Sequence, residues 1–181
     1  AKAGLVIGGG PIGVGAYFAL KSFGVETIIV SEPSAARREV LARIGVEHLI
    51  DPTSQDVAET VRELTGGAGA DVAIECSGAP VAFNGALAAL GLYGRMVVVA
   101  AYEKPVQFNP ALELQGGKSL QMSSVYTKDD FQGVIDGIAA GVYSAEGGWV
   151  ETAQLEDVEE AIDRLRRGEG MKILIDTTPR G

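Results

Sequence analysis

The sequence predicts an α/β fold of the Rossmann type, in which a doubly wound parallel sheet of six strands carries helices on both faces. Two observations support this prediction. From the first residues to about residue 140, short apolar runs alternate with amphipathic stretches of helix length, an order typical of βαβ units. The first unit, residues 4–32, also joins its strand to its helix through a glycine-rich turn at residues 8–13.

That turn, GGGPIG, has the composition of a phosphate-binding loop. Gly8 permits a tight turn after the strand, Gly10 leaves room for a pyrophosphate to approach the backbone, and Gly13 lets the helix lie close to the sheet. Pro11 has no N–H and suits the first helical position. We therefore expect the amides of Ile12 and Gly13, at the positive end of the helix, to donate to phosphate oxygens.

Glu32 follows the second apolar run, 19 residues after Gly13. This is close to the spacing of about 20 residues at which an acidic residue accepts hydrogen bonds from the adenosine ribose hydroxyls. A carboxylate there would repel a 2′-phosphate, whereas Arg37 and Arg38, which could bind one, lie a turn into the next helix. The spacing therefore predicts NAD rather than NADP as the cofactor.

The remaining elements follow from the hydrophobic pattern and from glycine and proline positions. On the first helix, residues 11–23, we expect Ile12, Ala16, Leu20 and Phe23 to face the sheet. The apolar run 95–101 reads as a parallel strand covered on both faces. Further strands are expected at 27–30, 47–51, 71–75 and 119–126, and helices at 35–44, 56–64, 81–90, 106–117 (short) and 128–140.

Residues 1–147 are expected to form the dinucleotide-binding domain. Residues 148–181 have a different pattern, which predicts a strand at 150–155, a helix at 156–167 and a strand at 171–176. The first strand begins by about Ala3, so we expect the chain to be a piece of a larger polypeptide. Open parallel sheets bind ligands at the carboxyl ends of their strands. The ends at 75–78 and 99–101 should therefore line one crevice with the glycine turn.

Composition narrows the function classes. A net charge of −9 and a sequence pI of 4.6 argue against nucleic acid or an anionic membrane as a partner. No apolar stretch approaches the roughly 20 residues of a transmembrane helix, which favours a cytoplasmic protein. Cys76 is the only cysteine, so no internal disulfide and no thiolate zinc site can form within the chain.

These motifs resemble one family, the zinc-type medium-chain alcohol dehydrogenases, and within it the polyol and butanediol dehydrogenases. The resemblance covers essentially the whole chain and implies a subunit of two domains: a β-rich domain with the catalytic zinc, and the doubly wound domain. It rests on residues 6–13 (VIGGGPIG), Glu32-Pro33-Ser34 with Arg37-Arg38, residues 69–78 (GADVAIECSG), 94–99 (GRMVVV) and 155–161 (LEDVEEA).

The resemblance implies a set of cofactor contacts. Ile12 and Gly13 would face the pyrophosphate, Glu32 the adenosine ribose, and Arg37 the edge of the adenosine pocket. The loops after the later strands would take the rest of the dinucleotide. Cys76, Ser77 and Gly78 would line the ribose region, and the backbone of Val99, Ala100 and Ala101 and of Ser124 to Tyr126 would bind the nicotinamide carboxamide.

The resemblance also implies partners. The intact enzyme would pass a hydride between NAD(H) and a small alcohol or ketone, and the sheet edge near Ser119 to Tyr126 would pair in a homodimer or homotetramer. The zinc ligands and the proton relay belong to the N-terminal domain of the family. No catalytic or metal-binding residue is therefore assigned in this chain, which is expected to bind NAD(H) without oxidising alcohols.

Two alternative functions remain open. One is a zinc-free quinone or enoyl reductase that uses NADPH, against which Pro11, Ile12 and Glu32 argue. The other is a non-catalytic regulatory domain that senses NAD, against which residues 75–78 and the C-terminal segment argue. The identity of the alcohol or ketone does not follow from these residues.

Overall fold

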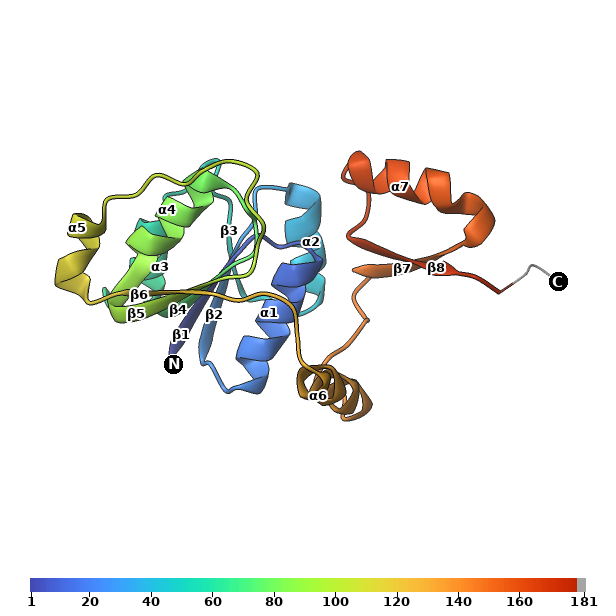
Figure 1. Ribbon diagram of the computed structural model, residues 1–181, viewed down its shortest axis with the longest axis horizontal. Helices are drawn as coiled ribbons and strands as arrows, with labels where there is room; N and C mark the ends of the chain where they lie inside the picture. The colour runs from blue at the N-terminus through green and yellow to red at the C-terminus, as the bar shows by residue number, and fades with distance from the viewer. Residues whose placement is uncertain (179–181) are drawn as a thin grey trace.

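The computed structural model describes residues 1–178, except for the side chain of Gln115, and is built around a six-stranded parallel sheet (Figure 1). The strand order β3-β2-β1-β4-β5-β6 places the first strand in the middle, which confirms the predicted doubly wound topology. The strands are β1 (Ala3–Ile7), β2 (Thr27–Ser31), β3 (His48–Ile50), β4 (Ala70–Glu75), β5 (Leu90–Val98) and β6 (Ser119–Met122).

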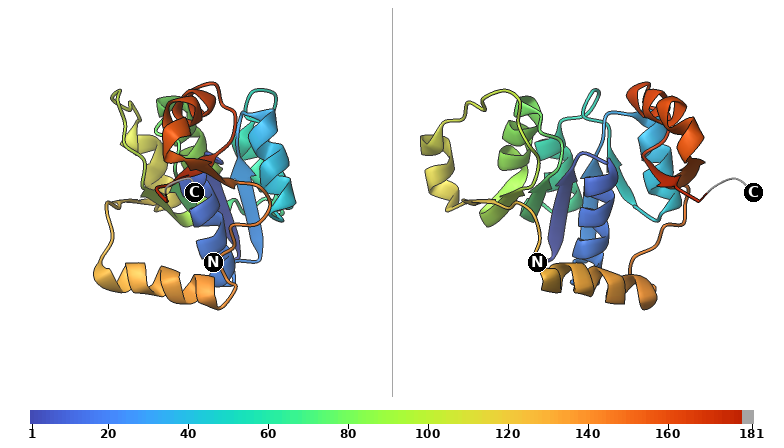
Figure 2. Two further views of the ribbon diagram at one scale, coloured as in Figure 1. Left: turned by 90° about the vertical axis from the view of Figure 1, so that its right-hand side faces the viewer. Right: turned by 45° about the vertical axis from the view of Figure 1, so that its right-hand side comes forward.

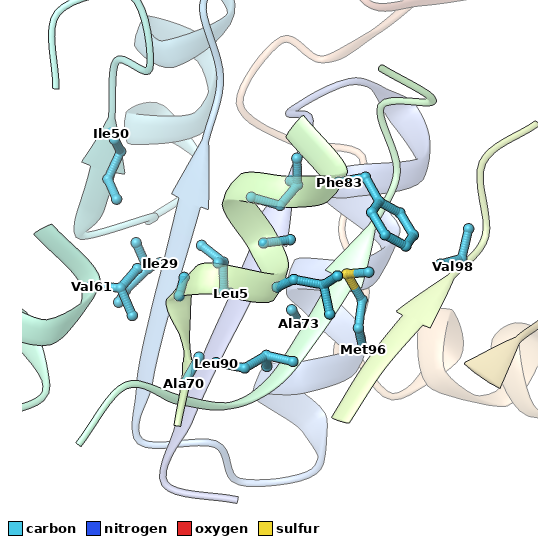
Figure 3. Packing of buried hydrophobic residues seen from close by; sticks show 14 residues of the cluster. Leu5, Ile29, Ile50, Val61, Ala70, Ala73, Phe83, Leu90, Met96 and Val98 are labelled. Atoms are coloured by element: carbon cyan, nitrogen blue, oxygen red, sulfur yellow. The ribbon is translucent and has the colours of Figure 1, made fainter. Parts of the chain in front are cut away.

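Helices cover both faces of this sheet, as predicted. They are α1 (Pro11–Ser22), α2 (Ala35–Arg43), α3 (Val57–Leu64) and α4 (Pro80–Ala89). Alternate residues of one strand point to opposite faces, so Leu5 packs in the cluster with α3 and α4, while Val6 packs in the cluster with α1 and α2. Figure 3 shows the first cluster, in which Ile29 of β2 lies beside Val61 of α3.

The face of α1 that contacts the sheet differs from the expected one. Leu20 is buried, but Ile12 and Phe23 are 61% and 86% exposed, so the prediction for these two residues was wrong. Ile12 lies in the first turn of the helix, at the edge of the sheet, and Phe23 follows its last residue. The buried side of the helix consists of Gly13, Val14, Tyr17, Phe18 and Leu20.

The strands β5 and β6 also end earlier than predicted. β5 stops at Val98 and β6 at Met122, so residues 99–101 and 123–126 lie beyond the carboxyl edge of the sheet. Met96 is fully buried in the cluster with α4, whereas Arg95 on the other face is exposed. The prediction that this strand is covered on both faces therefore holds for one face only.

Two short helical segments, α5 (Pro110–Glu113) and the 3₁₀ helix η1 (Leu114–Gly116), precede β6, and α6 (Lys128–Ala139) follows it. The helix α6 begins with a capping box between Thr127 and Asp130, in which each side chain accepts a hydrogen bond from the other residue's backbone amide. None of its described residues is buried, and Phe131 and Ile138 are more than half exposed.

The C-terminal segment forms a separate sheet of two parallel strands, β7 (Val150–Gln154) and β8 (Lys172–Asp176), joined by the 3₁₀ helix η2 (Leu155–Asp157) and by α7 (Val158–Arg166). Figure 2 shows it on the side of the molecule that carries α2. Met171 and Trp149 pack in the cluster of α1 and α2, and Arg43 Nε donates to Gly147 O at 3.2 Å. Residues 179–181 of the predicted segment lie outside the described residues.

Among residues 1–178, no helix combines the length and the apolar character needed to cross a bilayer.

Candidate nucleotide-binding site

The carboxyl ends of β1, β2 and β4 form the candidate site. Ile7 at the end of β1 is paired with Ser31 of β2 on one side and with Glu75 of β4 on the other. The chain crosses one face of the sheet to reach β2 and the opposite face to reach β4, so a topological switch point lies above β1. Loops that diverge at such a point leave a crevice between them.

The glycine turn lies at this point. Gly8 has a positive φ of 93°, and its N–H donates to Ser31 O at 2.8 Å. A Cβ built on Gly13 would lie 1.9 Å from Gly8 O, so only glycine lets the helix start against the turn. A Cβ on Gly10 would meet only Arg37 Nη1, at 3.8 Å, so the backbone there is open to a ligand. The turn itself thus requires glycine at positions 8 and 13, and Gly10 leaves its backbone accessible.

The first turn of α1 begins directly after the glycine turn. The helix begins at Pro11, and the Val14 N–H donates to Gly10 O at 2.9 Å. The amides of Ile12 and Gly13 precede that bond and lie in the part of a helix that lacks intrahelical acceptors. With the positive end of the helix dipole behind them, they can bind an anion.

Glu32 is only 3% exposed and ties the end of β2 to the glycine turn. Its Oε2 accepts from Gly9 N at 2.7 Å and its Oε1 from Ser34 N at 2.8 Å. Each carboxylate oxygen can accept more than one hydrogen bond, so these bonds leave capacity for a ribose hydroxyl. Sequence reasoning had not anticipated that the same side chain holds the turn, nor that Gly9 takes part.

The two arginines of α2 have different surroundings. Arg38 Nη1 donates to the carbonyls of Glu32 and Pro33 at 2.7 and 2.8 Å, and its Nη2 pairs with Asp51 Oδ2 at 2.8 Å. Arg38 is thus committed to the ends of β2 and β3. Arg37 instead extends toward Gly10, over the glycine turn. It is not among the residues that line the neighbouring cavity.

A cavity of about 450 Å³ opens beside the turn. Its walls come from the strand ends, from the loop between β3 and α3, and from α4. The sequence predicted that Gly8 and Ser77 line this site, but it did not predict the residues from the loop and the helix. Pro33, which directly follows Glu32, does signal a chain reversal at this point. The lining residues are Ile7, Gly8, Ser31, Pro33, Pro52, Thr53, Gln55, Asp56, Val57, Ala58, Ser77, Ala79, Val81, Ala82, Gly85 and Ala88.

The loop after β4 holds the expected ribose-region residues. The Ser77 hydroxyl donates to Glu75 Oε1 and accepts from Ala79 N at 3.2 Å, so both of its hydrogen-bonding functions are engaged within the protein. Cys76 packs against the cluster of α1 and α2 and is not among the residues that line the cavity. Burial, and secondarily the nearby Glu75 carboxylate, raise the pKa of the Cys76 thiol to about 12, so it stays protonated at neutral pH.

The loops after β5 and β6 differ in how closely they join the crevice. The N–H groups of Val99 and Ala100 donate to Glu75 O at 3.0 and 3.3 Å, which fixes the start of the 99–101 segment beside the loop after β4. Ser124 and Tyr126 are exposed, and the Tyr126 ring stacks on Phe131 of α6 at 5.8 Å.

The described residues do not fit a metal centre, because no three of their histidine, cysteine, aspartate or glutamate side chains lie close enough together to bind one. His48, the only histidine, lies in β3 at the opposite side of the sheet order from β5 and β6. No catalytic step through zinc is therefore derived from this chain.

Comparisons with known proteins identify one family. The family model described as zinc-binding dehydrogenase matches residues 11–140. A probable alcohol dehydrogenase from a Pseudomonas species is 35% identical over 144 residues, which make up 78% of this chain and 42% of that protein. A probable (R)-acetoin-forming diacetyl reductase from Saccharomyces cerevisiae is 36% identical over 142 residues, 76% of this chain and 34% of that protein.

Solved structures give the same result for the fold. The crystal structure of 2R,3R-butanediol dehydrogenase from Bacillus subtilis matches with a TM-score of 0.88 and 28% identity, covering 98% of this chain and 51% of that one. Benzyl alcohol dehydrogenase from Acinetobacter calcoaceticus shares the fold with a TM-score of 0.90 at 24% identity. The chain spans about half or less of the length of these relatives. It belongs to the zinc-binding dehydrogenase family, the family that its sequence motifs resemble.

Proposed function

We propose that this chain is the NAD(H)-binding domain of a zinc-dependent medium-chain alcohol or polyol dehydrogenase. The observation that carries the proposal is the open backbone at Gly10, placed at the amino end of α1 with the Glu32 carboxylate beside it. A phosphate needs the first feature and a ribose hydroxyl the second.

The dinucleotide fits the residues present. In this proposal the amides of Ile12 and Gly13 bind the pyrophosphate, and Arg37 adds a positive charge above the same turn. Glu32 accepts from the ribose and disfavours a 2′-phosphate. The adenosine occupies the cavity of about 450 Å³, whose walls include Pro33 and Val81.

The nicotinamide would carry the hydride to or from the substrate carbon. The residues of this chain would bind and orient it, with the backbone of Val99 to Ala101 and of Ser124 to Tyr126 at the carboxamide and Cys76 to Gly78 at the ribose. The substrate would be a small alcohol or ketone, as the names of the diacetyl reductase and butanediol dehydrogenase relatives suggest. The zinc and its ligands would come from a separate β-rich domain.

We also propose the assembly of the intact enzyme. The strand β6 lies at the end of the sheet order, and its outer edge is available for pairing with a second copy in a dimer or tetramer. Beyond the nucleotide-binding domain of residues 1–147, residues 148–178 form their own small sheet, which contacts α1 and α2 through Trp149 and Met171 and would also dock on the zinc-binding domain.

Titration of the 181-residue chain with NADH and, separately, with NADPH tests the proposal. The nucleotide's own fluorescence reports binding. We expect NADH to bind and NADPH to bind at least tenfold more weakly, because the 2′-phosphate meets the Glu32 carboxylate. Tighter binding of NADPH would instead favour the NADPH-dependent reductase, and binding of neither nucleotide by the folded chain would refute the proposal.

A further inference from the structure

Glu75 is a fully buried acidic residue in the middle of the sheet, at the carboxyl end of β4. It is paired in register with Ile7 of β1 and with Val98 of β5, both buried apolar residues. Burying a carboxylate is costly unless hydrogen-bond donors compensate it, and an apolar side chain would satisfy the packing of this position. The acid therefore serves something other than the core.

Most of the donors around its side chain come from the loop that follows β4. Glu75 Oε1 accepts from Ser77 N at 2.8 Å and from the Ser77 hydroxyl, and the Gly78 N–H lies 3.2 and 3.3 Å from its two carboxylate oxygens. One side chain thereby fixes the backbone of two successive residues and the rotamer of Ser77. Ser77 lines the cavity and lies next to Gly8 of the glycine turn.

The backbone of the same residue holds the neighbouring loop. Glu75 O accepts from the N–H groups of Val99 and Ala100, the first residues after β5. Tyr102 lies on this loop, its ring packs edge-on against Phe83 at 6.1 Å, and its hydroxyl is buried. Burial and the adjacent Glu75 carboxylate raise the pKa of Tyr102, which indicates that its hydroxyl stays protonated beside the acid.

We propose that Glu75 is a positioning residue for the coenzyme, which locks the loops after β4 and β5 into one surface for the nicotinamide-ribose half of the dinucleotide. This inference deepens the proposed function and rests on it. Glu75 is completely buried, so it would act without touching the coenzyme. Its side chain acts through Ser77 and the Gly78 amide, while its backbone carbonyl, which any residue at this position would supply, holds Val99 and Ala100. The adenosine half lies mainly against β2, α3 and α4, and the only lining residue of that cavity whose side chain Glu75 holds is Ser77, next to the glycine turn.

The test compares Glu75→Leu with Glu75→Gln in the full 181-residue chain. Leucine removes every side-chain acceptor, whereas glutamine keeps one oxygen that can accept from Ser77 N, the Ser77 hydroxyl and Gly78 N. We expect leucine to weaken NADH binding by about tenfold, comparable to the lower end of the loss seen when an outer-shell hydrogen-bond partner is removed at a metal site. Glutamine should stay within about threefold of wild type. The affinities of the Glu75→Leu and wild-type chains for 5′-AMP, which carries only the adenosine half, should agree within about threefold.

The comparison separates positioning from a structural role. If Glu75 only stabilised the fold, its replacement would change the affinities of the folded fraction for NADH and for 5′-AMP alike, and that outcome would overturn the inference. An unchanged NADH affinity in Glu75→Leu would also overturn it. Circular dichroism gives the folded fraction, and Glu63→Leu, an exposed acid on α3, is the matched control. If Glu75→Leu does not fold, Glu75→Asp takes its place, because the shorter side chain withdraws the carboxylate, and the same selective loss of NADH is required.

The proposed function and this inference fail in different ways. A folded wild-type chain that binds neither NADH nor 5′-AMP would refute both. A wild-type chain that binds NADH, together with a folded leucine variant that binds it equally well, would refute the inference alone.

Discussion

The sharpest prediction concerns Gly13→Ala in the first turn of α1. The added methyl group would lie 1.9 Å from Gly8 O and 2.9 Å from Gly8 C, whereas ordinary contacts begin at 3.4 Å. Both atoms belong to the backbone of the glycine turn, so no side chain can rotate away. The helix start must therefore move outward by roughly 1.5 Å, the shortfall at the oxygen, or the turn must change shape.

The cost follows from this overlap. Overpacking a close contact typically destabilises a protein by about 1–3 kcal/mol, and a clash between two backbone segments belongs at the upper end. We expect Gly13→Ala to lower the free energy of unfolding by about 3 kcal/mol, and the melting temperature by roughly 6–12 °C for a domain of this size. Because the amides of Ile12 and Gly13 move with the helix, NADH affinity should fall at least tenfold.

Gly15→Ala provides the matched control. It lies in the same helix, is exposed, and an added Cβ meets no atom within 4 Å. Replacing glycine by alanine inside a helix stabilises it by about 0.5–1 kcal/mol, so this variant should melt slightly above wild type and bind NADH normally. Urea and thermal unfolding followed by circular dichroism, with NADH titration, measure both effects. A Gly13→Ala chain with wild-type stability and affinity would show that the close approach of helix and turn has been misread.

Three further predictions address the rest of the site. Glu32→Ala should weaken NADH binding by about 1.5–3 kcal/mol, as expected for hydrogen bonds to a charged group, and should narrow the preference for NADH over NADPH; unchanged NADH affinity would place the ribose elsewhere. Hydrogen bonds from Thr53, and then Arg38, hold the pKa of Asp51 below its usual range. The stabilising contribution of Asp51 is therefore present above about pH 3.8 and is lost as the pH falls further. The free energies of unfolding of wild type and Asp51→Asn should differ above that pH and converge below it. The Cys76 pKa of about 12 means that the folded chain keeps a proton that the unfolded chain loses near pH 9. The free energy of unfolding should therefore decrease between pH 9 and 12, and it should decrease less steeply in Cys76→Ala. A thiol reagent that reacts equally fast at about pH 8 with the folded and the urea-unfolded chain would contradict this prediction.

The sequence predicted the elements around the glycine turn well because local chemistry determines them. Positive φ at Gly8 and the proline at the first helical position are properties of single residues, and the strand pattern on either side is continuous. The exposed ends of α1 were harder to predict. Ile12 and Phe23 match the helical period, but period alone does not show where a helix projects beyond the sheet that it covers.

The parts of the site that were missed depend on contacts between distant segments. An acidic residue at the end of an apolar strand reads as its polar boundary, so Glu75 gave no signal of its own; its role appears only when the Ser77, Gly78 and Val99 amides converge on it. The early end of β6 has a similar cause. Residues 119–122 pair only with β5, which ends at Val98, and after the Ser123 N–H donates to Val98 O the residues that follow have no strand beside them to continue the ladder.

The central position of β1 has a consequence for how this chain acquires its ligand site. β2 pairs with β1 after one local crossover, whereas β4, which pairs with the other edge of β1, is separated from it in sequence by β2, β3 and three helices, so its pairing is the less local of the two. A refolding intermediate that contains β1 to β3 alone would have the glycine turn with one wall of the crevice missing. Recovery of coenzyme fluorescence during refolding should therefore lag behind the recovery of helical signal. Added nucleotide should leave the rates of the early refolding phases unaffected and should slow the unfolding of the complete sheet.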